Sequence, residues 1–304
     1  MSDGAAPGEA ELAAARLPGA CDCHIHVFGP VSRYPYAPGR RYTPPEATAA
    51  AYMALRRRLG LERVVVVQPS VYGTDNRRHC DALDEIPASR GVAVLSGDEP
   101  DAEIERLHRA GFRGIRLNLR QGRQHEPIGA TLSRLGARLG GFGWHVHINA
   151  ATDTLADAEA DLARAPVPLM FDHYGGLSPW AGVLQPGLES VLRLLATGNC
   201  WIKLSAPYIH RHAGPGHRRE ASALAGARAL VAAMSAAAPD RLVWGSNWPH
   251  PGFVSPTTAD AAPLAPLREI DDGAMLRLFH RIVGDEATAR RILCDNAADF
   301  YGFD

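Results

Sequence analysis

The sequence predicts an α/β fold: a single (β/α)₈ barrel of eight parallel strands surrounded by helices. Short apolar segments rich in β-branched residues alternate along the chain with segments that have helical periodicity. A length of 304 residues suits eight strand–helix units. A doubly wound open sheet is the alternative, but the first strand is not followed by the Gly-x-Gly-x-x-Gly turn of that fold.

The eight strands are expected near residues 21–27, 63–68, 92–96, 113–118, 144–149, 168–173, 200–205 and 241–246. Their nearly continuous apolar character is typical of parallel strands that are buried on both faces. The helices are expected near 45–59, 75–88, 101–110, 128–140, 153–164, 187–197, 220–238, 273–282 and 285–293. The first helix is expected to begin at Pro45, because proline favours the first helical turn.

We expect residues 1–18 to form a flexible N-terminal segment and residues 19–304 to form the barrel. The first 17 residues lack the basic start and apolar stretch of a secretory signal, and no apolar run reaches 18 residues. Five cysteines without zinc-finger spacing indicate reduced thiols. These features predict a cytoplasmic protein that does not span a membrane.

The charge composition indicates a small-molecule partner. The chain carries 32 Lys and Arg against 33 Asp and Glu, for a net charge of -1, and has no long basic segment. This balance argues against nucleic acid or an anionic membrane as the main partner. The sequence gives no indication of the oligomeric state.

Polar residues end most of the predicted strands, at the edge where a parallel barrel holds its active site. The first strand contains His24 and His26, two residues apart. Because side chains alternate along a strand, we expect both imidazoles and Asp22 on one face, and Cys21, Cys23, Ile25 and Val27 on the other. The other polar strand ends are Gln68 and Ser70, Ser96, Arg116 and Asn118, His147 and Asn149, Asp172 and His173, Lys203 and Ser205, and Ser246 and Asn247.

The histidines at this edge have two interpretations. In the first, His24, His26, His147 and His173 hold a catalytic zinc ion, for which neutral imidazole is a common ligand. In the second, no metal is bound, and His24, His26 and His173 donate hydrogen bonds to a substrate carbonyl and stabilise its oxyanion. Asn247, at the end of the last strand, is a weak metal ligand and cannot act as a general base.

Several blocks in this order resemble the amidohydrolase superfamily, and within it the 2-pyrone-4,6-dicarboxylate hydrolase (lactonase) branch. They cover nearly the whole chain from about residue 20. The blocks are His24-Ile25-His26, the segment 33–45, the run 68–76, Gly114-Ile115-Arg116, Phe171-Asp172-His173, Trp248-Pro249-His250 and the closing segment 296–303.

The resemblance implies a TIM barrel that hydrolyses a carboxylate-bearing lactone without a metal, in the breakdown of aromatic compounds. It implies that His24, His26 and His173 surround the lactone carbonyl. Arginines and hydroxyl groups would bind the carboxylates, because arginine presents a planar fork of donors to them. The implied catalytic residues are His24, His26, His173, Asn247 and His250. The candidate substrate-binding residues are Ser70, Tyr72, Thr74, Arg116, Arg123, His147 and Arg211, with Arg120 as a further candidate.

Asn247 departs from the lactonase pattern, which has an aspartate there to deprotonate water. One hypothesis is that His250, Asp172 or one of the clustered histidines serves as the base, since histidine suits proton transfer at neutral pH. A second is that the protein is a lactone isomerase acting on sugar-acid lactones. A third is that it binds an organic acid without catalysis.

Lys203 is the only lysine in the chain, and it lies on the seventh strand. Carboxylated lysines that bridge two metals in this superfamily lie on the fourth strand, so a binuclear centre is not expected. Lys203 is expected either to bind a substrate carboxylate or to pair with an internal acid, Asp22 or Asp172. Asp172 and His173 are adjacent, so we expect only His173 to enter the site unless the strand ends there.

Overall fold

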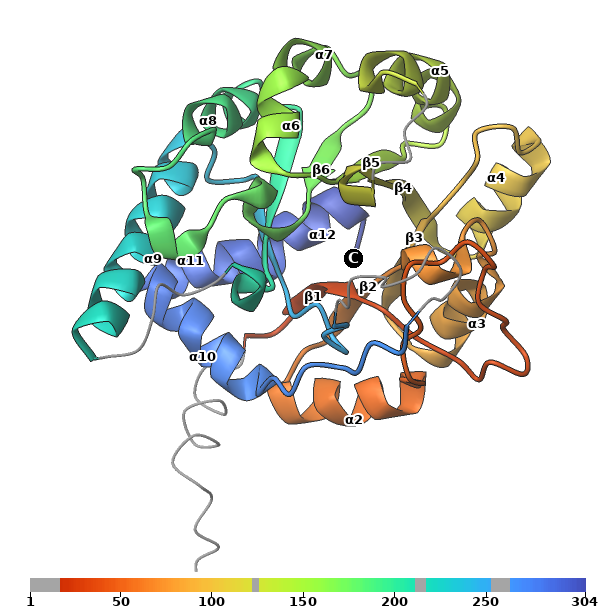
Figure 1. Cartoon of the computed structure of the whole chain (residues 1–304), viewed down its shortest axis with the longest axis horizontal. Coiled ribbons are helices and arrows are strands. Elements are labelled where there is room, and N and C mark those ends of the chain that lie inside the picture. The colour runs from red at the N-terminus through yellow and green to blue at the C-terminus, as the bar shows by residue number, and fades with distance from the viewer. Residues whose placement is uncertain (1–16, 122–125, 211–216, 253–262) are drawn as a thin grey trace, which may run out of the picture.

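The computed structural model describes residues 17–121, 126–210, 217–252 and 263–304, and it confirms the predicted barrel (Figure 1). Its eight strands are parallel neighbours in chain order. The strands are β1 (Cys21–Ile25), β2 (Arg63–Val67), β3 (Ser89–Ala93), β4 (Phe112–Asn118), β5 (His145–Asn149), β6 (Leu169–Phe171), β7 (Cys200–Ser205) and β8 (Leu242–Gly245).

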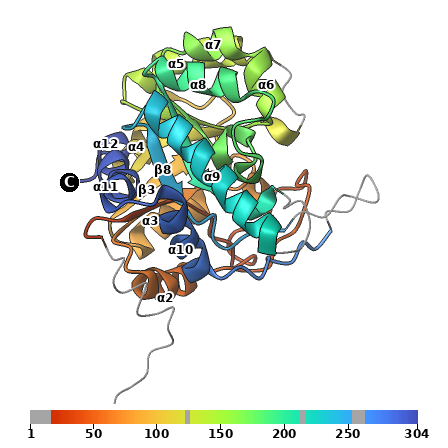
Figure 2. The ribbon, with the colours of Figure 1, turned by 90° about the vertical axis from the view of Figure 1, so that its left-hand side faces the viewer.

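Helices connect consecutive strands and surround the barrel (Figures 1 and 2). The α-helices are α2 (Ala49–Leu59), α3 (Arg77–Glu85), α4 (Asp101–Arg109), α5 (Ile128–Gly140), α6 (Thr152–Asp157), α7 (Glu159–Ala163), α8 (Leu188–Ala196), α9 (His217–Ala237), α10 (Asp272–Val283), α11 (Glu286–Arg290) and α12 (Asn296–Tyr301). Short 3₁₀ segments follow several strands: η1 (Ser70–Tyr72), η2 (Leu119–Gln121), η3 (His173–Gly176), η4 (Pro179–Ala181) and η5 (Pro207–Ile209).

The barrel closes where β1 meets the end of β8. The backbone N–H of His26 donates to the carbonyl of Trp248, and that of Asn247 donates to the carbonyl of His24, both at 2.8 Å. Gly245 permits this approach, because a Cβ atom there would lie only 2.8 Å from the Cβ of His24. The closing strand therefore brings Asn247 next to the two histidines of β1.

Two apolar layers stabilise the barrel. The outer layer packs the strands against the helices, and it includes Ile25 and Val27. The inner layer contains Cys21 and Cys23 and is joined by Tyr301 of α12. Figure 2 shows α11 and α12 together at one end of the barrel. Since Tyr301 contacts the beginnings of the strands, this end is opposite the predicted active-site edge.

The alternation expected for β1 is interrupted by a bulge. The pairing with β2 shifts register between Asp22 and Ile25. Asp22 therefore does not share a face with the histidines: its carboxylate accepts hydrogen bonds from the backbone N–H and hydroxyl of Ser246 and from the hydroxyl of Tyr52 in α2. The prediction was wrong for Asp22 and the two cysteines because a bulge re-aims side chains.

Side-chain hydrogen bonds explain two shifted boundaries. β3 ends at Ala93 rather than near residue 96, because the amide of Asn76 bonds both the N–H and the carbonyl of Val94. Helix α2 begins at Ala49 rather than Pro45, because Thr48 accepts from the N–H of Ala51 and caps the helix.

Two predicted helices are interrupted. The helix expected over 153–164 is split into α6 and α7, and the one expected over 285–293 continues from α11 through a π-helical segment, Arg291–Asp295, into α12.

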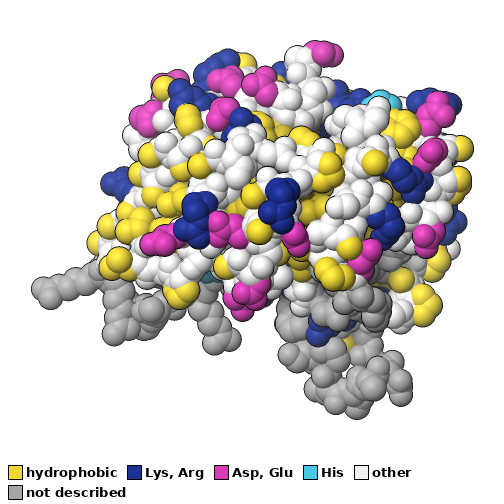
Figure 3. Space-filling view, turned by 90° about the horizontal axis from the view of Figure 1, so that it is seen from above, with side chains coloured by type: hydrophobic (Ala, Val, Ile, Leu, Met, Phe, Trp, Pro, Cys, Tyr) yellow, Lys and Arg dark blue, Asp and Glu magenta, His cyan; other side chains and the backbone are white. Residues whose placement is uncertain are grey.

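The expected flexible segment 1–18 lies outside the described residues except for Leu17 and Pro18. Among the helices that the structure describes, none is long and apolar enough to cross a membrane. On the face seen in Figure 3, basic and acidic side chains are interspersed.

Candidate active site

A cavity opens at the carboxyl ends of the strands. Its volume is about 680 Å³, including the space open to solvent at its mouth. The polar residues that line it are His26, Tyr42, Ser70, Arg116, Asn118, Arg120, Asn149, His173 and Asn247. The predicted active-site edge therefore contains a hollow lined by imidazole, guanidinium, amide and hydroxyl groups.

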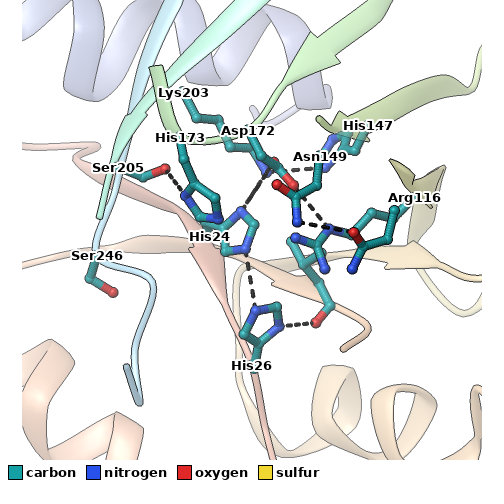
Figure 4. A network of polar contacts seen from close by, with 12 residues as sticks. His24, His26, Arg116, His147, Asn149, Asp172, His173, Lys203, Ser205 and Ser246 are labelled. Atoms are coloured by element: carbon teal, nitrogen blue, oxygen red, sulfur yellow. Dashed lines mark hydrogen bonds and ion pairs between the residues drawn. The ribbon is translucent and has the colours of Figure 1, made fainter. Parts of the chain in front are cut away.

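A buried carboxylate, Asp172, lies at the centre of the charges beneath this cavity (Figure 4). One of its oxygens accepts from Nε of Arg116 at 2.9 Å, and the other lies 3.3 Å from Nζ of Lys203. Burial alone would raise the pKa of Asp172, but Lys203, His24 and Arg116 hold it well below its usual range. The alternative in which Lys203 pairs with Asp172 is thus the one observed.

Lys203 also determines where two histidines carry their protons. Its Nζ lies 3.1 Å from Nδ1 of His24 and 3.0 Å from Nδ1 of His147. An ammonium group can only donate, which favours a proton on Nε2 of each neutral ring, although Nδ1 of His24 also lies 3.3 Å from Oδ1 of Asp172.

His26 has the opposite tautomer. Its Nδ1 donates to the carbonyl of Val67 at 2.7 Å, which leaves a lone pair on Nε2. That Nε2 lies 3.4 Å from Nε2 of His24, which is the group able to donate to it. Burial lowers the pKa of His26 to about 3, so the ring is neutral at pH 7.

Asp172 and His173 both enter the site, because β6 ends at Phe171. Nδ1 of His173 lies 2.9 Å from Oγ of Ser205 on β7, and the ring is close to that of His24, with centroids 4.9 Å apart. Burial lowers the pKa of His173 to about 3.

Backbone strain concentrates around the same edge. Among the described residues, those other than glycine with positive φ are Ala88, His173, Tyr174, Ala206, Asn247 and His250. All but Ala88 follow β6, β7 or β8. A non-glycine residue in this conformation costs about 1–3 kcal/mol, and such residues cluster at functional sites.

The candidate residues from the sequence fall into four groups. His26, Ser70, Arg116, His173 and Asn247 line the cavity. His24 and His147 are wholly buried beneath it, and His250 lies behind Asn247. Tyr72 and Thr74 are not among the lining residues, and the Tyr72 hydroxyl accepts from the N–H of Gly29 at 2.8 Å. Arg123 and Arg211 lie outside the described residues.

Other lining residues were not selected from the sequence as site residues. Asn118 and Asn149 end neighbouring strands and hydrogen-bond to each other at 3.2 Å. Their position as polar strand ends was the signal that could have selected them. Tyr208 and Asp272, described below, carry no such signal, because they lie in a loop segment and at a helix start.

The metal hypothesis can be tested against the donor chemistry. Oxygen and nitrogen atoms of His24, Asp172 and His173 lie within 4.8 Å of one another, a grouping that could hold an ion. In metal sites, however, a ligating histidine usually donates its other ring N–H to an acceptor. At His24, Nδ1 lies 3.1 Å from the ammonium of Lys203, a donor, and 3.3 Å from Oδ1 of Asp172, an acceptor. The Asp172 contact matches that pattern, whereas the buried ammonium of Lys203 opposes a further cation at this ring.

Comparisons with known proteins identify the family. The amidohydrolase family model matches residues 21–303. The chain belongs to the amidohydrolase family. A 4-sulfomuconolactone hydrolase from Rhizobium radiobacter is 36% identical to this amidohydrolase over 93% of the chain and 90% of its own length. A 2-pyrone-4,6-dicarboxylate hydrolase from Comamonas testosteroni is 32% identical over 94% of this chain and 91% of its own.

A solved structure gives the same relationship. It is described as a probable 2-pyrone-4,6-dicarboxylic acid hydrolase from Acinetobacter baumannii with citric acid bound. It superposes on this amidohydrolase with a TM-score of 0.76 and 25% identity, over 94% of this chain and all of its own. The expected resemblance to the amidohydrolases and their lactonase branch is confirmed.

Proposed function

We propose that this amidohydrolase hydrolyses a small lactone that carries one or more carboxylate groups. The observation that carries the proposal is the cavity itself, where the hydrogen-bond donors His173 and Arg116 lie beside a second guanidinium, Arg120. The relatives named as hydrolases of acidic lactones support the same substrate class.

The arginines would bind the acid groups. Nε of Arg116 is fixed by Asp172 and Nε of Arg120 donates to the carbonyl of Ala150, so both guanidinium groups are oriented before substrate binds. Asn118 and Asn149 add amide groups to the same wall. Two oriented guanidinium groups suit a dianion, since each presents a planar fork to a carboxylate.

His173 would polarise the lactone carbonyl. Donation from the hydroxyl of Ser205 to Nδ1 would place the proton on Nε2, where the ring can donate to the developing oxyanion. A donor of this kind contributes about 3 kcal/mol to lowering the barrier. His26 has no N–H to offer in this role, because its proton bonds to Val67. We therefore revise the expectation that His24, His26 and His173 all donate to the carbonyl.

Asn247 would hold the attacking water. Its Nδ2 donates to the hydroxyl of Tyr208 at 2.9 Å, which leaves Oδ1 to accept from a molecule in the cavity. Water would add to the carbonyl carbon, and collapse of the oxyanion would break the ring C–O bond and release a hydroxy acid. We propose that the reaction needs no metal, because the ammonium of Lys203, 3.1 Å from Nδ1 of His24, opposes a second cation at that ring.

A lactone isomerase is the second candidate, and Asn247 is the observation that favours it. A neutral amide can orient a substrate hydroxyl as readily as water, and that hydroxyl would then attack the carbonyl of its own ring.

The experiment is a panel of lactones followed by acid titration at constant pH. The panel contains a pyrone dicarboxylate, a muconolactone, a sugar-acid lactone and an uncharged lactone of similar size. Hydrolysis releases one acid equivalent per lactone consumed, whereas isomerisation releases none. We expect turnover with acid release, and a kcat/KM at least 100-fold higher for the carboxylated lactones. Consumption without acid release would favour the isomerase, and no consumption would contradict both.

A further inference from the structure

Three side chains form a continuous chain behind Asn247. The Tyr208 hydroxyl accepts from Nδ2 of Asn247 at 2.9 Å and lies 2.8 Å from Nδ1 of His250. On the far side of the ring, Nε2 of His250 lies 3.0 Å from Oδ1 of Asp272, within ion-pair distance but outside hydrogen-bond geometry. Tyr208 belongs to η5 after β7, His250 follows β8, and Asp272 begins α10, so three separate segments converge on this chain.

The groups at the two ends fix the direction of the protons. The Asp272 carboxylate can only accept, and because it faces Nε2 of His250 it favours a proton on that nitrogen and a lone pair on Nδ1. The Tyr208 hydroxyl therefore donates to Nδ1 of His250 while it accepts from Asn247. This is the arrangement in which a histidine, oriented by a carboxylate, takes a proton from a hydroxyl group.

The far end of the chain is closed to bulk water, whereas Tyr208 is half-buried. His250 is 3% exposed and Asp272 is 5% exposed. Burial raises the pKa of Tyr208, so its hydroxyl stays neutral and would pass a proton on rather than act as a phenolate. The guanidinium of Arg268 faces the Tyr208 ring, 5.9 Å from its centroid.

Two segments that carry the chain are strained. Asn247 has φ of 66° and His250 has φ of 61°, both in the left-handed region. Ala206, two residues before Tyr208, has φ of 49°. Strain in both loops is independent evidence of function, because such conformations are kept where they aim particular groups.

The groups that face the cavity or lie directly beneath it are poorly suited to take a proton. The Nε2 lone pair of His26 faces Nε2–H of His24, and the pKa of His26 is only about 3. Asp172 is bound by Arg116 and Lys203, which hold its pKa well below its usual range and make it a weak base. A base for water is therefore better sought behind Asn247.

We propose that Tyr208, His250 and Asp272 form a proton relay that accepts the proton of the water held by Asn247. This inference rests on the proposed lactone hydrolysis. As the water oxygen bonds to the carbonyl carbon and the π electrons move to the carbonyl oxygen, one water proton passes to Tyr208. The proton of Tyr208 passes to Nδ1 of His250, and Asp272 stabilises the resulting imidazolium. When the ring C–O bond breaks, the proton returns through Tyr208 to the leaving oxygen.

The test is the solvent isotope effect on kcat in mixtures of H₂O and D₂O, measured for the wild type and for Tyr208→Phe. For the wild type we expect a curved dependence on deuterium fraction, because two protons move in one step. For Tyr208→Phe we expect kcat to fall about 100-fold, the scale of general base catalysis. KM should stay within threefold, and the remaining isotope effect should be linear.

Two further variants complete the experiment. Asp272→Asn should lower kcat, and the dependence of kcat on deuterium fraction should become linear as in Tyr208→Phe. This variant still tests the relay if Tyr208→Phe does not fold. Tyr34→Phe is the matched control: it removes the hydroxyl that bonds Asp81, away from the cavity, and should leave kcat and the curve unchanged.

The outcomes separate the relay from the proposed function. If the wild type hydrolyses lactones and Tyr208→Phe keeps its kcat, or loses kcat while the curvature stays, the relay is contradicted and the hydrolase is not. If the wild type hydrolyses none of the lactones, the proposed function fails and the relay fails with it.

Discussion

A single carboxylate, Asp172, organises the groups beneath the cavity. It is wholly buried and lies within 3.3 Å of atoms on Arg116, Lys203 and His24. Burying a charge is costly unless it is paired and hydrogen-bonded. Arg116 and Lys203 provide this pairing, and Asp172 in turn orients the Arg116 guanidinium.

His173 gives the sharpest prediction at the residue scale. Replacing it with alanine removes the proposed donor to the oxyanion, so kcat should fall about 100-fold while KM changes less than fivefold. Steady-state kinetics on a carboxylated lactone measure both constants. His280→Ala, on the outside of the barrel in α10, is the control and should behave as the wild type. Turnover by His173→Ala at the wild-type rate would contradict the role.

Individual residues were only partly predictable from the sequence. The pattern His24-Ile25-His26 and the end of β6 indicated where imidazoles would gather, and Lys203 was expected to pair with an acid. Proton positions could not be predicted, because they depend on contacts between distant strands, such as Lys203 with His24 and His26 with Val67. Tyr208 and Asp272 were missed for the same reason.

At the scale of elements, β1 and β8 shape the site. The bulge in β1 lets Cys23 pack in the barrel interior while His24, the next residue, joins the polar network above it. β8 then approaches β1 through Gly245 and delivers Asn247 beside His26.

Gly245→Ala tests this closure. The added Cβ would lie 2.8 Å from the Cβ and 2.9 Å from the backbone nitrogen of His24, so β1 or β8 must shift. Overpacking of this kind costs about 1–3 kcal/mol. We expect a lower urea midpoint, and a loss of kcat larger than the loss of stability alone would produce. Gly284→Ala is an informative comparison, because nothing lies within 4 Å of the added atom there, although its φ of 86° adds strain. An unchanged midpoint and kcat for Gly245→Ala would contradict the role of the closure.

The order and type of the elements followed from the sequence, and their ends did not. All eight strands were predicted because buried parallel strands are short, nearly continuous apolar runs. The end of β3 depends on the side chain of Asn76, which is distant in the chain from Val94, so local patterns could not supply it.

At the scale of the molecule, an unusual number of buried histidines makes stability depend on pH. Burial lowers the pKa of six wholly or almost wholly buried histidines: His24, His26, His79, His145, His147 and His173. Below about pH 6.5 the unfolded chain binds protons on these rings and the native state does not. The contribution of the neutral rings to the free energy of unfolding is therefore largest above about pH 6.5, and it decreases as the pH falls below that value. Burial raises the pKa of Asp22 to about 6. Between about pH 4 and pH 6 the native state therefore binds a proton at Asp22 that the unfolded chain does not, which increases the free energy of unfolding as the pH falls. This opposing contribution comes from one group, against six histidines.

We therefore expect the free energy of unfolding to be level from pH 8 to pH 7 and to fall steeply below pH 6. Each histidine contributes up to about 1.4 kcal/mol per pH unit. Urea unfolding at pH 8, 7, 6 and 5 measures the slope. His79→Phe should reduce the slope of the free energy of unfolding against pH by the contribution of about one proton. Phenylalanine can replace this ring because both ring nitrogens of His79 lack a hydrogen-bond partner in the described part of the chain. A midpoint at pH 5 equal to that at pH 7 would show that these rings do not titrate as their burial requires.

We propose that this cavity opens acidic lactones through its own side chains and without a metal ion. The most direct measurement is acid release from a carboxylated lactone by enzyme dialysed against a chelator, with the metal content of the same sample determined. We predict one acid equivalent per lactone and an undiminished kcat at less than about 0.1 metal ion per chain. Activity that disappears with the metal and returns when zinc is added would contradict the account.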